Sequence, residues 1–235
     1  MSKQTQSNQI HIVLGLGKSG ISAAKLLKSE GKEVLVLENN RNEKLISISN
    51  KLESEGINVI LLDEQLNINN FTPWIGKIDN IIVSPGIEWE HKVLKELRSK
   101  NINIQGEVEM AWERLNHIPS IAITGTNGKT TVTNMLNHVL KSNGLNTDMG
   151  GNIGKALSKI ALESINNHHQ HLNWLVLELS SYQIEGSPKV EPTIGIWTTF
   201  TPDHLERHND IESYFKIKRS LLEKSTIRIY NSDDQ

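Results

Sequence analysis

The clearest chemical signal in the sequence is a phosphate-binding loop, Thr-Gly-Thr-Asn-Gly-Lys-Thr-Thr, at Thr124–Thr131. The apolar run Ser120–Ile123 precedes it, which indicates a buried strand that passes into a helix through a tight loop. Gly125 and Gly128 permit a backbone whose N–H groups point at an anion, and the helix dipole adds favourable partial charge. The usual pattern begins with a glycine where this chain has Ile123, so the match is to a shorter variant. We therefore predict an ATP site made of Gly125, Thr126, Asn127, Gly128, Lys129, Thr130 and Thr131.

Two side chains of this loop have distinct expected roles. Lys129 is placed to reach the β and γ phosphates, and the Thr130 hydroxyl to bind Mg²⁺. The alternative is a strand–helix turn that contains Gly-Lys-Thr by chance. The strand before the loop and the amphipathic helix after it favour phosphate binding.

A second glycine loop, Gly15-x-Gly17-x-x-Gly20, follows the apolar run Ile10–Leu14. The acidic residue Glu38 ends the next strand, as in dinucleotide-binding folds. The loop alone leaves three interpretations open: a dinucleotide such as NAD, another nucleotide diphosphate, or a purely structural turn. The phosphate loop at Thr124–Thr131 argues against NAD, because two phosphate sites on two α/β units suggest an enzyme that joins a nucleotide-bearing substrate to ATP chemistry.

Three further residues are candidates for metal or catalytic roles. Glu178 lies near the carboxyl end of an apolar strand, where a carboxylate is suited to hold Mg²⁺, although a solvated or capping glutamate fits the position too. His204 follows a strand and a proline at a loop edge, where most histidines are solvated. Lys218, between Lys216 and Arg219, is by default part of a basic helix face.

The elements that must position these residues follow a strand–turn–helix rhythm, which predicts an α/β fold with mainly parallel strands. The predicted strands are 10–14, 34–37, 59–62, 80–83, 102–104, 120–123, 174–179, 193–199 and 227–230. The predicted helices are 21–30, 42–55, 92–100, 107–115, one after the phosphate loop, and 215–224. The helix after the phosphate loop has an apolar stripe that predicts one buried face; its members are Val132, Met135, Leu136, Val139 and Leu140. A connector at 116–119 divides the chain into domains 1–116 and 117–235.

Composition limits the possible partners. The 235 residues are 37% hydrophobic and 22% charged, with a formal net charge of −2. These values are ordinary for a soluble globular protein, and they provide no electrostatic footprint for nucleic acid or an anionic membrane. The chain has no cysteine, which excludes disulfides and thiolate metal sites. No signal peptide or membrane span is recognisable, so we expect a cytoplasmic protein without membrane insertion.

Taken together, these motifs resemble the Mur ligases of bacterial cell-wall synthesis, and among them the D-glutamate-adding members. The resemblance covers essentially the whole chain in order, and Glu-Leu-Ser-Ser-Tyr-Gln at 178–183 is its most discriminating string. The other matching segments are 15–20, 84–86, 106–109, 124–131, 150–154, 201–208 and Lys218. The resemblance implies an N-terminal Rossmann-like domain that holds the uridine diphosphate of the sugar substrate, followed by a P-loop ATPase-like central domain.

The resemblance implies specific residue roles at the sugar nucleotide. Leu16, Lys18 and Ser19 are expected at the diphosphate, and Glu38 and Asn39 near the uridine. Ser84 and Gly86 are expected to line the same cleft, and Asn152 to contact the substrate. An arginine that often follows the acidic position falls one residue late, at Arg41, and Thr199 stands where the family often has asparagine; we assign Thr199 no role.

The chemistry that the resemblance implies is ATP-dependent amide formation. ATP phosphorylates the carboxylate of UDP-N-acetylmuramoyl-L-alanine, and the D-glutamate amine attacks the acyl phosphate through a tetrahedral intermediate. One Mg²⁺ is expected on Thr130 and Glu178, and a second on His204 and Lys218, where CO₂ has converted the lysine to a carbamate. Lys129, Glu178, His204 and Lys218 are thus the expected catalytic residues of a monomeric enzyme.

The resemblance also implies a C-terminal domain to which nothing in the sequence corresponds. We therefore expect a C-terminally truncated chain with little or no activity alone. Two other hypotheses stay open: a nucleotide-binding module without activity, and an NAD-dependent dehydrogenase that uses the first glycine loop.

Overall fold

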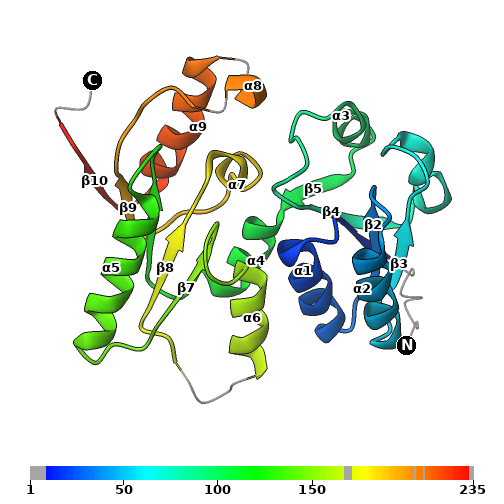
Figure 1. The fold of residues 1–235 in the computed structure, drawn as a ribbon, viewed down its shortest axis with the longest axis horizontal. Helices are drawn as coiled ribbons and strands as arrows, with labels where there is room; N and C mark the ends of the chain where they lie inside the picture. Colours follow the sequence, from blue (N-terminus) through cyan, green and yellow to red (C-terminus); the bar gives the residue numbers. More distant parts are fainter. Residues whose placement is uncertain (1–8, 167–170, 204, 209, 233–235) are drawn as a thin grey trace, which may run out of the picture. The chain divides into compact units, whose positions relative to one another are not determined.

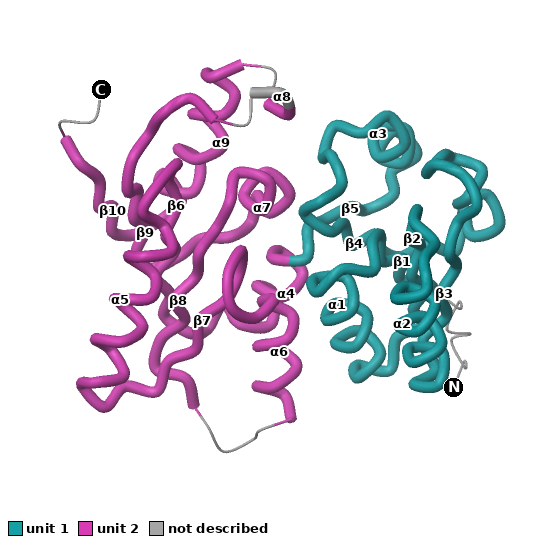
Figure 2. Tube along the Cα trace, in the orientation of Figure 1, with its two compact units in different colours: residues 1–107 teal, residues 108–235 magenta. Residues whose placement is uncertain are grey.

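The computed structural model describes residues 9–166, 171–203, 205–208 and 210–232, and the chain forms two compact units, residues 1–107 and 108–235 (Figure 2). Each unit contains a five-stranded sheet whose strands are all parallel. This α/β architecture confirms the predicted fold class. The chain divides at the start of helix α4 (Glu107–Leu115), whereas the sequence places the domain boundary at its end.

The first unit has the strand order β3-β2-β1-β4-β5 (Figure 1). Its strands are β1 (Ile10–Leu14), β2 (Glu33–Glu38), β3 (Asn58–Leu61), β4 (Ile78–Val83) and β5 (Asn103–Gly106). The central strand β1 is buried at every position, and β2 is buried from Val34 to Leu37. Such continuous apolar runs are typical of parallel strands covered on both faces.

The helices of the first unit lie against this sheet. They are α1 (Lys18–Ser29), α2 (Glu43–Ser54) and α3 (Lys92–Ser99), with 3₁₀ turns at Ile68–Asn70 and Thr72–Trp74. Asn42 caps α2 by accepting a hydrogen bond of 3.0 Å from the Leu45 N–H, which explains why the helix begins there. Phe71, Leu94 and Leu97 complete the core against the sheet.

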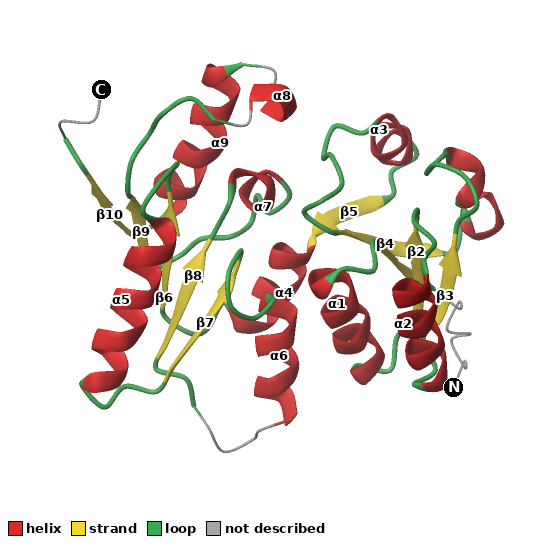
Figure 3. Ribbon diagram, in the orientation of Figure 1, coloured by secondary structure: helices red, strands yellow, loops and turns green. Residues whose placement is uncertain are grey.

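The second unit has the strand order β10-β9-β6-β8-β7. Its strands are β6 (Ser120–Thr124), β7 (Thr147–Gly151), β8 (Trp174–Glu178), β9 (Ile194–Trp197) and β10 (Ile227–Tyr230). Its helices, after α4, are α5 (Lys129–Ser142), α6 (Leu157–Asn166), α7 (Ser181–Glu185), α8 (Leu205–His208) and α9 (Ile211–Lys224). Figure 3 shows α5 on one side of this sheet and α4 and α6 on the other.

The predicted elements are present with shifts of a few residues at their ends. The α1 helix begins at Lys18 rather than at Ile21, because Gly17 serves as its N-cap. The α9 helix begins at Ile211 rather than at Phe215, because Asp210 caps it through the Ser213 N–H at 2.7 Å. Sequence analysis did not predict β7, α6, α7 and α8.

The apolar stripe of α5 is only partly buried, which corrects the prediction. Val132, Leu136 and Leu140 pack against the core of the second sheet. Met135 and Val139, however, are 62% and 52% exposed. The helix contacts the sheet along a narrower strip than the sequence pattern indicates.

Within the residues that the structure describes, no helix is both long and apolar enough to cross a membrane.

Candidate functional site

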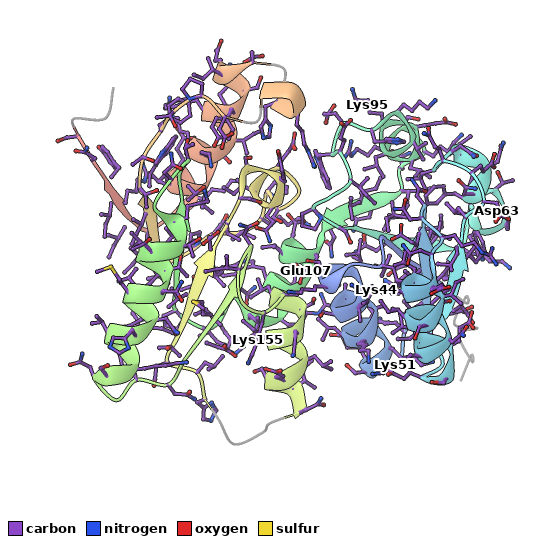
Figure 4. The ribbon with its side chains drawn as sticks, viewed as in Figure 1. Lys44, Lys51, Asp63, Lys95, Glu107 and Lys155 are labelled. Carbon is purple, nitrogen blue, oxygen red and sulfur yellow. The ribbon has the colours of Figure 1, made fainter. Side chains whose placement is uncertain are left out.

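A cavity of about 610 Å³ opens in the first unit where β1, β2 and β4 end. In a doubly wound sheet the strand order reverses beside the central strand, and ligands bind at the carboxyl ends of the strands there. Seven residues predicted for sugar-nucleotide binding line this one cavity; they are Leu16, Lys18, Ser19, Glu38, Asn39, Ser84 and Gly86. Arg41 is not among its lining residues and pairs with Asp63 (labelled in Figure 4) at 3.2 Å.

The three glycines of the first loop differ in how much room each has for a side chain. Gly15 has a φ of +95°, and a Cβ there would lie 2.9 Å from Ser84 Oγ. A Cβ on Gly20 would lie 1.9 Å from the Gly15 carbonyl oxygen, so α1 can pack this closely only with glycine. Gly17 has ordinary backbone angles and open space around it. Gly15 and Gly20 are therefore required by the fold, while Gly17 keeps the cavity clear.

The Glu38 carboxylate, at the end of β2, accepts a hydrogen bond from the first glycine loop. One oxygen accepts a 2.7 Å hydrogen bond from the Leu16 N–H, and the other accepts from the Asn40 N–H at 2.8 Å. In dinucleotide-binding folds the residue at this position bonds the ribose. Here one carboxylate oxygen bonds the backbone of the glycine loop, and the other bonds Asn40 just after β2.

The second unit gathers its chemical groups where β6, β8 and β9 end side by side. The strand register pairs Ile123 with Glu178 and Thr124 with Trp197. Glu178 is 1% exposed, and one carboxylate oxygen accepts a 2.8 Å hydrogen bond from the Thr130 hydroxyl. The expected ligands of one Mg²⁺ are thus adjacent.

Asn152 lies in the second unit and contacts Glu178. Its side-chain amide donates to the second carboxylate oxygen at 2.8 Å, and its backbone N–H donates to the Glu178 carbonyl oxygen at 2.8 Å. A Cβ on Gly151 would lie 2.3 Å from that carbonyl oxygen, so the loop after β7 approaches β8 only with glycine there. A substrate contact for Asn152 stays a prediction.

The phosphate loop has the backbone that its glycines permit. Gly125 and Gly128 have φ values of +143° and +82°, and Gly128 is the N-cap of α5. The first N–H groups of a helix have no partner within it and form an anion site together with the dipole. The Lys129 ammonium donates to the carbonyl oxygens of Gly125 at 2.9 Å and Thr126 at 2.7 Å. A contact of Lys129 with nucleotide phosphates stays a prediction.

Lys218 is buried beside this loop, so the interpretation as a basic surface residue is wrong. Its side chain reaches inward from α9, and the residue is 1% exposed. The amine donates to Gly125 O at 2.8 Å and lies 4.7 Å from the centre of the Tyr214 ring. Burial and the nearby positive charge of Lys129 together lower the pKa of Lys218 to about 7, against the opposing effect of Asp203. Near neutral pH a large fraction of this amine is therefore uncharged.

A segment that sequence analysis left without a role also holds the phosphate loop. Thr199 accepts from the Thr126 N–H through its carbonyl oxygen at 2.8 Å, and from the Asn127 N–H through its hydroxyl at 3.0 Å. The Thr126 hydroxyl bonds both backbone groups of Thr201. The pairing of β6 with β9 was the missing information, because it brings residues about 75 positions apart together.

One predicted metal ligand, His204, lies outside the described residues. Among those that are described, no group of three or more histidine, cysteine or acidic side chains forms a metal cluster. The pair Thr130 and Glu178 nevertheless fits Mg²⁺, which prefers a few hard oxygen ligands and keeps several waters.

Lys155, labelled in Figure 4, forms a separate charged group in the second unit. Its ammonium bonds Asp148 at 2.8 Å and Glu163 at 2.7 Å. These two hydrogen bonds raise the pKa of Lys155 against the opposing effect of desolvation. The group links β7, α6 and the loop between them, which indicates a structural role.

Two family models match the chain. The model of the Mur ligase MurD-like N-terminal domain matches residues 9–106, and the model of the Mur ligase middle domain matches residues 123–235. The first match lies within the first compact unit, and the second match lies within the second.

The chain is also similar to proteins named UDP-N-acetylmuramoylalanine–D-glutamate ligase. It is 82% identical to the one from Prochlorococcus marinus (strain NATL2A) over all 235 residues, which are 50% of that protein. It is 52% identical to the one from P. marinus (strain MIT 9313), with 95% of this chain and 48% of that protein covered. The chain thus spans about half the length of the curated relatives it matches.

Two solved structures share the fold at low sequence identity. A UDP-N-acetylmuramate:L-alanyl-gamma-D-glutamyl-meso-diaminopimelate ligase from Neisseria meningitides matches with a TM-score of 0.61 and 18% identity, over 97% of this chain and 72% of that one. A UDP-N-acetylmuramate-alanine ligase from Thermotoga maritima matches with a TM-score of 0.55 and 21% identity, over 96% and 49%.

Proposed function

The chain belongs to the Mur ligase family, of which it holds the MurD-like N-terminal and middle domains, and we propose that it supplies the sugar-nucleotide and ATP sites of a D-glutamate-adding ligase. The substrates of this proposal are UDP-N-acetylmuramoyl-L-alanine, D-glutamate and ATP, and the product serves bacterial peptidoglycan synthesis. The single observation that carries the proposal is the 82% identity along the whole chain to a relative of that name.

The cavity of the first unit supports a sugar-nucleotide site. Lys18 and Ser19 begin α1 beside it, so a diphosphate there meets a helix N-terminus and an ammonium group. The preference for a UDP-sugar over NAD rests on the second phosphate loop and on the named relatives, because both nucleotides carry a ribose that the Glu38 carboxylate can meet.

The second unit supports ATP chemistry. The N-terminus of α5 and the Lys129 ammonium hold the phosphates, which leaves the γ phosphorus open to attack by the substrate carboxylate. A carboxylate oxygen bonds to that phosphorus and ADP leaves. The D-glutamate amine then attacks the acyl carbon, inorganic phosphate leaves, and the amine loses a proton. Fixed positive charge stabilises both negatively charged transition states.

Two Mg²⁺ ions belong to this proposal. Bound Mg²⁺ would neutralise charge developing on the phosphate and acyl oxygens. Thr130 and Glu178 would hold the first ion, and His204 and carbamylated Lys218 the second. The lowered pKa of Lys218 supports the carbamate, because the neutral amine is the form that bonds CO₂ and releases a proton.

We place the enzyme in the bacterial cytoplasm as a monomer.

Calorimetric titration of the 235-residue chain tests the two sites. We expect UDP-N-acetylmuramoyl-L-alanine to bind. We expect NADH, whose binding is followed by its fluorescence, not to bind. Tight NADH binding without a response to the UDP-sugar would favour a dehydrogenase. The protein encoded by the complete reading frame is also assayed for D-glutamate incorporation with ATP and Mg²⁺. If that protein binds the UDP-sugar but incorporates no D-glutamate, a binding module without activity would be favoured.

A further inference from the structure

The phosphate loop is joined to the segment after β9 and to α9 by hydrogen bonds of a set of hydroxyl groups. We define the threonine clamp as Thr126, Thr198, Thr199, Thr201 and Tyr214. The hydrogen bonds of the clamp join two loops that are far apart in the sequence. Their donors and acceptors are uncharged groups, so the strength of these hydrogen bonds depends on burial and geometry.

The Thr126 hydroxyl is the centre of the clamp. It donates to Thr201 O at 3.0 Å and accepts from the Thr201 N–H at 3.1 Å. The Tyr214 hydroxyl lies 3.3 Å away. A hydroxyl has one proton, so when Thr126 gives it to Thr201, Tyr214 must be the donor of the third bond. Burial raises the pKa of Tyr214, which keeps that proton in place.

The backbone of the loop is held by the same segment. The N–H groups of Thr126 and Asn127 donate to Thr199, and the Thr198 hydroxyl donates to Asn127 O. These two N–H groups are therefore directed away from the position of an anion at the start of α5. The N–H groups that follow, from Gly128 onward, lie at the N-terminus of a 14-residue helix, where the first N–H groups have no partner within the helix.

The clamp also reaches the buried amine. Tyr214 precedes Lys218 by one helical turn of α9, and the Lys218 ammonium donates to the loop at Gly125 O. Gly125 has no room for a side chain, because a Cβ there would lie 2.1 Å from Thr198 Oγ1. The loop is thus fixed from one side by α9 and from the other by the segment after β9.

We propose that Thr126 is a positioning residue: through Thr199, Thr201 and Tyr214 its hydroxyl and N–H fix the phosphate-loop backbone in the shape that accepts a nucleotide, without touching the nucleotide. A preformed loop avoids the loss of conformational freedom that ordering on binding costs. This inference rests on the proposed ATP site and assigns the residue a task other than phosphate contact.

The test compares nucleotide affinity with stability in matched variants of the 235-residue chain. Thr126→Val removes the hydroxyl and keeps the shape, and Thr126→Ser keeps the hydroxyl. We expect Thr126→Val to weaken Mg²⁺–ATP binding about fivefold to tenfold in calorimetry, and Thr126→Ser to retain wild-type affinity. Thr193→Val is the control, because its hydroxyl accepts the Ser120 N–H at 3.1 Å at the other end of the same sheet. That variant is expected to lower the urea midpoint and leave affinity unchanged.

A double-mutant cycle with Tyr214→Phe separates positioning from phosphate contact. If Thr126 acts through the clamp, the double variant loses no more affinity than the weaker-binding single variant. Additive losses, or wild-type affinity in Thr126→Val, would overturn the inference and leave the ATP site intact. Absence of nucleotide binding by the wild-type chain would overturn the proposed ATP site and the inference together.

Discussion

At the scale of single residues, burial decides what the Lys218 amine can do. An exposed lysine near pH 7 is almost entirely protonated, because its pKa is about 10.4. The same side chain 1% exposed beside Lys129 has a pKa of about 7. A neutral amine is nucleophilic, so the protein itself provides the condition for carbamate formation.

We therefore predict that Lys218 takes up CO₂ as the pH rises through about 7. Adding ¹³C-bicarbonate should produce a carbamate signal in the ¹³C NMR spectrum that grows between pH 6 and pH 8. The Lys218→Met variant should lack the signal. Lys216→Met is the matched control, because hydrogen bonding to Glu212 raises the pKa of that exposed amine. A signal that persists in Lys218→Met would assign the carbamate to another group.

The same pKa has a consequence for stability. The folded-state pKa of Lys218 lies below the unfolded value, so between about pH 7 and about pH 10.5 the unfolded chain binds more protons than the folded chain. The contribution of Lys218 to the free energy of unfolding should thus rise with pH across this window. Urea titrations of the wild type and Lys218→Met at pH 6 and pH 8 check this: the wild type should gain stability relative to the variant, and an unchanged difference would contradict the burial argument.

At the scale of elements, the turn from β1 to α1 separates folding from binding. Gly20 is in contact with the Gly15 carbonyl oxygen, while Gly17 has open space on the cavity side. The same substitution at the two positions therefore has different consequences. A methyl group at Gly20 must displace backbone, and one at Gly17 meets only the space that a ligand would fill.

We predict that Gly20→Ala lowers the free energy of unfolding of the first unit by about 2–4 kcal/mol, because the backbone must shift to admit the methyl group. Gly17→Ala should leave the urea midpoint within about 0.5 kcal/mol of the wild type but weaken UDP-sugar binding. Chemical denaturation and calorimetry on both variants provide the measurements. Equal destabilisation by the two substitutions would contradict the open space at Gly17, and wild-type UDP-sugar affinity in Gly17→Ala would show that this space is not a ligand site.

At the scale of the whole molecule, the two phosphate loops belong to different compact units with separate cores. Each loop follows the central strand of its own sheet, β1 or β6. The residues predicted at the uridine diphosphate therefore all lie in the first unit, and those predicted at the ATP phosphates in the second.

We predict that Lys129→Ala abolishes ATP hydrolysis by the complete enzyme while sugar-nucleotide affinity stays within about twofold of the wild type. The first effect follows from loss of the ammonium at the phosphates, and the second from the placement of the two loops in separate compact units. ATPase assays and calorimetry with the UDP-sugar provide the comparison, with Lys141→Ala on the exposed end of α5 as the control. Equal loss of both functions would mean that the two loops serve one site.

The sequence by itself determined the α/β class, the two glycine loops and nearly every buried strand. These features are local, because a run such as Ile10–Leu14 followed by glycines specifies a strand and a turn without reference to the rest of the chain. Through the resemblance to the Mur ligases it also indicated seven residues that line the first cavity, which follow three neighbouring strands of one sheet.

Only the tertiary structure decided the environment of Lys218, the exposure of Met135 and Val139, and the partners of Thr126. Each depends on which strands are neighbours. The order β10-β9-β6-β8-β7 places the segment after β9 and the residue ending β8 on either side of the phosphate loop. Because hydrogen bonds and burial act between surfaces in contact, residues with no local signal acquire their roles only when the sheet is formed.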